Sequence, residues 1–227
     1  MKQVVLDATS TISLMLGALG FFVVHVIVWT GLVLIAPGGD RVDYDLLGDA
    51  STPWVRQFVL PLTAVLILQS VYISRMGMWS EILRDRVRSQ RKWLLLPPVL
   101  LLAAGIGVFA NDGLGDASTN YWIGMTLTML LVGVTEEITF RGIIVAGARR
   151  TWNKDGFALI ASSVLFGLFH LPNWLLGQSL SMTIRQVVVT ALLGMVFFAL
   201  RRASGTLVTC IVLHAVYDWM IVQGVLV

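Results

Sequence analysis

The stretch YWIGMTLTMLLVGVTEEITFRGIIVAG, residues 121–147, decides how this chain folds. A helix of about 20 apolar residues crosses the hydrocarbon core of a bilayer, and this stretch is longer than that. It also carries Glu136, Glu137 and Arg141. Because a charge in the middle of a bilayer costs at least ~2.5 to 3.5 kcal/mol on insertion scales, such residues usually face a protein interior or a water-filled cavity. The stretch therefore predicts a membrane-spanning helix whose polar face points into a bundle.

The composition agrees with an integral membrane protein. Of the 227 residues, 57% are hydrophobic and 13% are charged, whereas a soluble domain usually carries about 25% charged residues. No polar stretch is long enough to build a separate aqueous core, so residues 1–227 are expected to form a single membrane domain. The formal net charge of +3 does not indicate a nucleic-acid partner, because the basic residues lie between apolar runs rather than along one face.

Seven apolar segments are long enough, within boundary error, to cross a bilayer. They are residues 11–36, 57–78, 94–110, 121–147, 157–176, 184–200 and 204–226. The connections between them are short. The sequence therefore predicts an all-α fold, a polytopic transmembrane helical bundle of about seven spans.

Basic residues are concentrated in alternate connections. Residues 75–92 hold six Arg and Lys, residues 149–154 hold three, and Arg201 and Arg202 form a third basic turn. The other connections are acidic or neutral, and the first of them contains Asp40, Asp43, Asp45, Asp49 and Arg41. By the positive-inside rule the N-terminus is expected in the cytoplasm and, with seven spans, the C-terminus outside. The absence of an organelle-targeting or retention signal favours the plasma membrane of a prokaryote.

Two features of the cytoplasmic side follow from this topology. Residues 81–92 are interpreted as a loop that sets the topology, with a short amphipathic helix on the membrane surface as the alternative. A cavity around Glu136 is expected to open to the cytoplasmic side, because the basic connection at 149–154 lies closest to its helix.

Polar groups on three different spans lie at a common depth. Counted at about 1.5 Å per residue from the cytoplasmic ends of their helices, Glu136 lies ~18 Å deep, His170 ~20 Å and His214 ~16 Å. Unrelated structural residues would not be expected to share a level, so these three are expected to meet in one polar site. His25 has no polar residue three or four positions away and is interpreted as structural.

Helical spacing groups the remaining polar residues into pairs. Residues four positions apart share a face of a helix, and this relation joins Glu137 to Arg141, which can form an ion pair. Glu136 lies about 100° around the helix and is left free to act. His214 and Asp218 repeat the spacing, so the carboxylate can orient the imidazole.

The fifth span is expected to end beside a histidine. Phe166 and His170 are again four residues apart, and Pro172 follows two residues later. Proline removes a backbone hydrogen bond and clashes with the preceding turn, and irregular backbone at this depth is tolerated where it lines a cavity. Taken alone, each pair also fits a structural role: a buried ion pair, a satisfied interior histidine or an interhelical hydrogen bond.

The three motifs together resemble a known family. They are Glu136-Glu137-x-x-x-Arg141, Phe166-x-x-x-His170 and His214-x-x-x-Asp218, in this order on three membrane helices. This pattern resembles the CPBP family, the CAAX-protease and bacteriocin-processing intramembrane endopeptidases related to the Rce1-type prenyl-protein protease. The resemblance covers residues 121–226. The third motif of the family commonly ends in Asn, so Asp218 is a departure, because a carboxyl group donates a hydrogen bond only when protonated.

The resemblance implies a peptidase that uses an activated water. Glu136 would be the general base, His170 would help to hold the water, and His214 with Asp218 would stabilise the developing oxyanion. Arg141 would keep Glu137 ionised. We also expect Phe166 to contact the substrate.

No cofactor is favoured, but a divalent metal such as zinc is an open alternative. Glu136, His170 and His214 resemble the His₂Glu ligand set of catalytic zinc sites, although the chain has no HExxH motif. The expected partners are a peptide or protein substrate, with or without a lipid modification, and the lipid bilayer.

Two other classes of function compete with the protease. One is a catalytically silent immunity or scaffolding protein that binds another membrane protein, but such a protein would not need every acidic and histidine position of the motifs. The other is a proton-coupled transporter, because intramembrane Glu, His and Arg also build relays. The chain shows no pair of broken helices repeated in two halves, which argues against a transporter.

Overall fold

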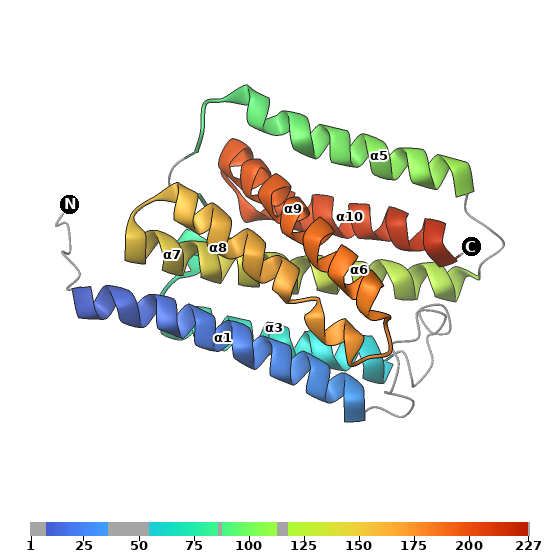
Figure 1. Cartoon of the computed structure of the whole chain (residues 1–227), viewed down its shortest axis with the longest axis horizontal. Coiled ribbons are helices and arrows are strands. Elements are labelled where there is room, and N and C mark those ends of the chain that lie inside the picture. Colours follow the sequence, from blue (N-terminus) through green and yellow to red (C-terminus); the bar gives the residue numbers. More distant parts are fainter. Residues whose placement is uncertain (1–7, 36–54, 86–87, 113–117, 227) are drawn as a thin grey trace.

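The structure is a computed structural model that describes residues 8–35, 55–85, 88–112 and 118–226. These residues form a helical bundle without a strand, which confirms the predicted all-α fold (Figure 1). In chain order the elements are α1 (Ala8–Ile35), the π-helix η2 (Val55–Val59), α3 (Leu60–Arg75), α4 (Trp79–Leu83), the 3₁₀-helix η3 (Lys92–Leu95), α5 (Leu96–Asp112), α6 (Thr119–Glu137), the π-helix η4 (Ile138–Ile144), α7 (Val145–Trp152), α8 (Asp155–Leu168), the 3₁₀-helix η5 (Leu171–Trp174), α9 (Leu180–Ser204) and α10 (Leu207–Leu226).

Five helical segments of the described chain are long and apolar enough to cross a membrane. They are Met15–Ile35, Val55–Arg75, Lys92–Ala110, Asp155–Trp174 and Leu180–Ser204. The predicted span at 121–147 coincides with the continuous run of α6, η4 and α7, and the predicted span at 204–226 coincides with α10, whose apolar part Leu207–Val222 is shorter. The chain is therefore an integral membrane protein. The acidic connection with Asp40 to Asp49, as well as Lys2, Arg86 and Asp116, lie outside the described residues.

Small residues bring the helices that carry the polar motifs close together. A Cβ added at Gly133 in α6 would lie 2.9 Å from the carbonyl oxygen of Ile211 in α10. Likewise, a Cβ at Gly194 in α9 would lie 2.8 Å from Cα of Ser163 in α8. Membrane helices commonly use small residues at such crossings, because no hydrophobic driving force separates helix contacts from lipid contacts. These crossings hold α6 against α10 and α8 against α9.

A π-helical turn follows directly after Glu137. Such turns are rare and occur mostly at functional sites, and they leave backbone carbonyls in need of other donors. Here the carbonyl of Thr135 accepts from Nε2 of Gln69 at 2.5 Å and from the Thr139 hydroxyl at 3.0 Å. The same amide nitrogen of Gln69 also donates to Oγ1 of Thr139 at 2.8 Å. A single side chain of α3 thus supports the irregular backbone beside the two glutamates.

The segment after α4 is a strap across one end of the bundle rather than a helix. Arg84 forms an isolated antiparallel bridge with Thr206, and the backbone N–H of Asp85 donates to the carbonyl of Gly205 at 3.0 Å. The carboxylate of Asp85 accepts two hydrogen bonds from Arg149, at 3.0 and 3.1 Å. Residues 81–83 belong to α4, whereas residues 84, 85 and 88–91 are not helical. The loop interpretation therefore holds for these six residues, and a continuous surface helix over 81–92 does not form.

Candidate active site

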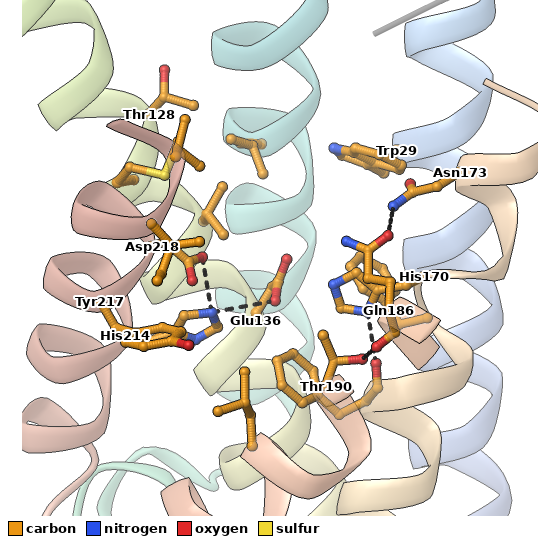
Figure 2. A pocket seen from close by; sticks show the side chains of 18 of the residues that line it. Trp29, Thr128, Glu136, His170, Asn173, Gln186, Thr190, His214, Tyr217 and Asp218 are labelled. Carbon is orange, nitrogen blue, oxygen red and sulfur yellow. Dashed lines mark hydrogen bonds and ion pairs between the residues drawn. The ribbon is translucent and has the colours of Figure 1, made fainter. Parts of the chain in front are cut away.

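A cavity of about 290 Å³ lies inside the bundle at the level of Glu136. Its wall includes five of the residues singled out from the sequence: Glu136, Phe166, His170, His214 and Asp218. Figure 2 shows these side chains on opposite sides of one space, with Asp218 and His214 on α10 facing Glu136, and His170 beyond it. Glu136, His170 and His214, which were predicted to meet in one site, thus line one cavity. Glu137 and Arg141 do not line the cavity, because they are fully buried behind it.

His214 lies between two carboxyl groups of the cavity. Its Nε2 atom is 3.2 Å from Oδ2 of Asp218 and 3.7 Å from Oε2 of Glu136 (Figure 2). The first distance is a hydrogen bond, whereas the second is too long for one. Glu136 is thus a carboxyl group at the cavity wall that lies within ion-pair range of His214 without a hydrogen bond to it.

A buried chain of polar groups supports His214 from behind. Oε1 of Glu137 accepts from Nδ1 of His214 at 2.9 Å and from Nη1 of Arg141 at 2.9 Å. The ion pair predicted between Glu137 and Arg141 is confirmed, but its contact with His214 was not foreseen. Because a carboxylate is only an acceptor, Nδ1 of His214 carries a proton and Nε2 faces the cavity.

Aromatic rings enclose the buried guanidinium of Arg141. Its central carbon lies 4.2 Å from the ring centroid of Phe166 and 5.0 Å from that of Phe197. Phe197 in turn stacks on His214 at a centroid distance of 4.8 Å. A cation over an aromatic face gains more when it is desolvated, as here. Phe166 is only 1% exposed, so its ring packs around the polar chain, and its predicted contact with substrate stays a prediction.

His170 stands at the end of a helix, as Pro172 predicted. α8 ends at Leu168, and η5 begins at Leu171 with the proline in its first turn. The Nδ1 atom of His170 donates to the carbonyl of Phe166 at 2.9 Å. A carbonyl cannot donate, so the proton is on Nδ1 and, in the neutral ring, Nε2 is an acceptor. The sequence identified this histidine, and the structure defines which nitrogen is free.

The sequence analysis missed polar residues on the wall opposite α10. Nδ2 of Asn173 donates to Oε1 of Gln186 at 2.9 Å, and both residues line the cavity (Figure 2). The side-chain carbonyl of Asn173 and the side-chain nitrogen of Gln186 do not take part in this bond. The only sequence signal was that Asn173 lies one helical turn after His170, and Gln186 had none.

His25 also lines the cavity, and its polar partner lies on another helix. Its Nδ1 atom is 2.9 Å from Oγ1 of Thr139 in η4. The Thr139 hydroxyl donates its own hydrogen to the Thr135 carbonyl, so it accepts from His25. A search at helical spacing within α1 could not detect this contact.

The described residues contain no group of three or more His, Cys, Asp or Glu side chains placed to hold a metal ion. Glu136, His170 and His214, the possible zinc ligands, line one cavity but are not brought together as a ligand set.

Residues 118–220 match the sequence model of a family described as type II CAAX prenyl endopeptidase Rce1-like. Over these residues the chain is similar to the Rce1-like, or CAAX-protease, family. No curated protein and no solved structure gives a significant match to the chain. The Rce1-like match runs from the start of α6 into α10, so it contains all three motifs.

Part of the cavity lies outside the Rce1-like match. His25 and Trp29 of α1, Phe58 of η2, Leu62 of α3, and Ile221 and Val222 of α10 complete the wall. The matched residues thus supply most of the polar groups of the cavity, and His25 is a polar group from outside the match.

Proposed function

We propose that this protein is an intramembrane endopeptidase that hydrolyses a peptide bond with a water activated by Glu136. The family match supports a CAAX-type endopeptidase. One observation carries the finer proposal: the carboxyl of Glu136, 3.7 Å from Nε2 of His214, lies at the wall of the cavity that His170, His214 and Asp218 also line. The substrate is a peptide or protein, with or without a lipid modification, and the chain works in the plasma membrane of a prokaryote.

The first step is attack of water on the scissile carbonyl carbon. Glu136 accepts a proton from the water as its oxygen forms the new bond to carbon. Nε2 of His170 accepts a hydrogen bond from the same water, because its Nδ1 proton is committed to the Phe166 carbonyl. Two acceptors on one water fix its position, and positioning of reactants supplies a large part of enzymatic rate acceleration.

The second step is breakdown of the tetrahedral intermediate. A proton on Nε2 of His214, or on the Asp218 carboxyl, donates to the oxyanion, and removal of one such donor typically costs about 10²- to 10³-fold in kcat. Glu136 then passes its proton to the leaving nitrogen, the carbon–nitrogen bond breaks, and Glu136 returns to its starting charge. Glu137 and Arg141 hold His214 in the required tautomer and orientation.

Cleavage of a peptide panel by the purified full chain in detergent tests the proposal. The panel contains prenylated and unprenylated peptides, and each assay is run with and without a chelator. Wild type is compared with Glu136→Gln, which keeps the shape of the side chain but removes the base. Glu81→Gln in α4, which replaces a carboxylate outside the cavity in the same way, is the matched control.

We expect wild type and Glu81→Gln to cleave and Glu136→Gln to lose at least about 10²-fold in kcat, as removal of a general base does. Retained activity under chelation supports the water-activating glutamate, and lost activity supports a metal-dependent site. Full activity of Glu136→Gln would refute the glutamate mechanism. If the folded wild type cleaves no peptide, capture of a membrane-protein partner becomes the test of the silent scaffolding alternative.

A further inference from the structure

The cavity extends from Glu136 toward one end of the bundle only. On α6 its wall continues from Glu136 to Thr128, and on α10 it continues from His214 to Val222, about 12 Å along each helix. On α9 it reaches Gln186, near the start of that helix. The start of α6, the end of α10 and the start of α9 all lie at the end where the C-terminus is found in Figure 1. We refer to this as the cavity end.

Packed side chains close the opposite direction. Between the glutamates and the turn after α9, the residues of one apolar cluster are nearly inaccessible to solvent: Ile73, Ile82, Ile138, Ile143, Ile144 and Leu207. A Cβ added at Gly142 would lie only 3.0 Å from Ile82, so no space separates η4 from α4. Beyond this layer, Nη2 of the buried Arg201 donates to the carbonyls of Glu81 and Ile82 at 2.9 and 3.3 Å. A substrate cannot reach Glu136 through this layer.

The closed direction leads to the basic end of the molecule. This arginine-rich end is formed by α4, the strap and the turns after α7 and α9, and its described Lys and Arg residues are Arg75, Arg84, Arg88, Arg91, Lys92, Arg149, Arg150, Lys154, Arg201 and Arg202. Only Glu81, Asp85 and Asp155 are acidic there among the described residues. At the cavity end, the basic residues of the described chain are Arg56 and Arg185 alone. Such a charge difference places the arginine-rich end in the cytoplasm.

From the closed arginine-rich end and the direction of the cavity, we infer that substrates reach Glu136 from the extracytoplasmic side of the membrane. This replaces the cytoplasmic opening expected from the sequence, which rested on the closeness of residues 149–154 to the glutamate helix. The inference rests on the proposed function in one respect, because it names the class of substrate for that site. That class is an exported or membrane-anchored polypeptide whose scissile bond lies at the outer leaflet.

The lining of the cavity end fits such a polypeptide. One wall is apolar, with Phe58, Leu62 and Met129 beside Ile221 and Val222. The lining also carries the amides of Asn173 and Gln186, of which one carbonyl and one nitrogen do not take part in the bond between the two side chains. An extended peptide has apolar side chains for the first wall and backbone donors and acceptors for the second. A soluble cytoplasmic substrate would meet neither wall.

Thiol labelling in sealed membranes tests the direction of access without requiring proteolysis. The native Cys210 is fully buried and donates to the carbonyl of Phe197 at 3.3 Å, so wild type is an unlabelled background. Val222→Cys places a thiol in the wall at the cavity end. Gln90→Cys places one on an exposed residue of the arginine-rich end and leaves every charge in place. Right-side-out and inside-out vesicles are treated with a charged, membrane-impermeant maleimide.

We expect the maleimide to modify Val222→Cys in right-side-out vesicles and Gln90→Cys in inside-out vesicles, with each thiol protected in the opposite preparation. Modification of both thiols from the same side of the membrane would contradict the conclusion that the cavity opens at the end opposite the arginine-rich end. The reverse pattern would overturn the extracytoplasmic assignment. Because labelling needs no cleavage, a failure here is separate from inactivity of wild type in the peptide assay. Detergent permeabilisation, after which both thiols must react, confirms that each introduced thiol is reactive.

Discussion

The Nδ1 atom of His214 donates a 2.9 Å hydrogen bond to Oε1 of Glu137, and this contact joins α10 to α6 at the level of the cavity. Glu137 therefore has two roles, because the oxygen that accepts from His214 also balances the charge of Arg141. The two adjacent glutamates have different surroundings: Glu136 faces the cavity, and Glu137 is enclosed. Their substitutions should consequently affect different properties.

Substitution Glu137→Gln should lower both stability and activity. The amide keeps an oxygen for His214 but leaves the buried Arg141 without a counter-charge, and breaking a buried pair in this way costs about 3–5 kcal/mol. A displaced His214 should reduce kcat/KM about 100-fold, as small misplacements of catalytic groups do. Thermal unfolding and peptide cleavage in detergent measure the two effects. Glu136→Gln is the matched control, because it should lose activity at an unchanged unfolding temperature. Equal unfolding temperatures for the two variants would contradict the assigned roles.

Substitution Asp218→Asn should preserve activity. The introduced amide supplies an N–H donor where the carboxyl of Asp218 stands. Asp218→Leu, of similar size, provides the control and should lose about 10²-fold in kcat because the donor is gone. Steady-state kinetics of the peptide assay measure both variants. An equal loss of kcat in Asp218→Asn and Asp218→Leu would show that Asp218 is not an oxyanion donor.

Substitution Gly133→Ala should separate the two helices that carry Glu136 and His214. Its Cβ would lie 2.9 Å from the Ile211 carbonyl and 3.2 Å from Cβ of Ala215, so α10 must move. Overpacking of this kind costs about 1–3 kcal/mol. We expect a lower unfolding temperature together with a lower kcat. The control is Gly107→Ala in α5, where an added Cβ meets no atom within 4 Å. If both alanine variants behave like wild type, the helix crossing is looser than the geometry implies.

Substitution Gln186→Ala should weaken substrate binding more than it slows chemistry. The amide pair with Asn173 lies across the cavity from His214. Loss of one hydrogen bond to the peptide should raise KM by roughly 3- to 10-fold, corresponding to about 0.5–1.5 kcal/mol. Steady-state kinetics of the peptide assay separate KM from kcat. Gln178→Ala, in the loop before α9 and outside the cavity wall, should leave both constants unchanged. A fall in kcat alone would assign Gln186 to the chemistry instead.

The sequence predicts those parts of the site that depend on spacing within one helix. The pairs Glu137 with Arg141 and His214 with Asp218 follow from helical periodicity, and the shared depth of Glu136, His170 and His214 follows from counting residues along apolar spans. Both are local properties of the chain. The helical bundle follows in the same way from apolar runs of sufficient length.

Contacts between different helices could not be predicted from residue spacing along single helices. Nothing in the local pattern pairs Gln69 with the carbonyl of Thr135, because the two lie on different spans and meet only where η4 leaves α-helical geometry. The bond from His214 to Glu137 depends on the rotation of α10 about its own axis, which Gly133 and Ile211 fix. The direction of the cavity depends on which layer of side chains is packed, and that is a property of the whole bundle.

The π-helical turn Ile138–Ile144 determines the direction in which the side chains of α7 point relative to those of α6. A π-helical turn contains more residues than an α-helical one, so the rod from α6 to α7 behaves as an α-helix with one residue inserted. Deletion of a single residue here would restore regular geometry and rotate α7 by about 100°. Arg149 and Arg150 would then leave Asp85 and Glu81, while Glu136 kept its place. One inserted residue thus allows a single continuous helix to place Glu136 at the cavity and Arg149 and Arg150 beside Asp85 and Glu81.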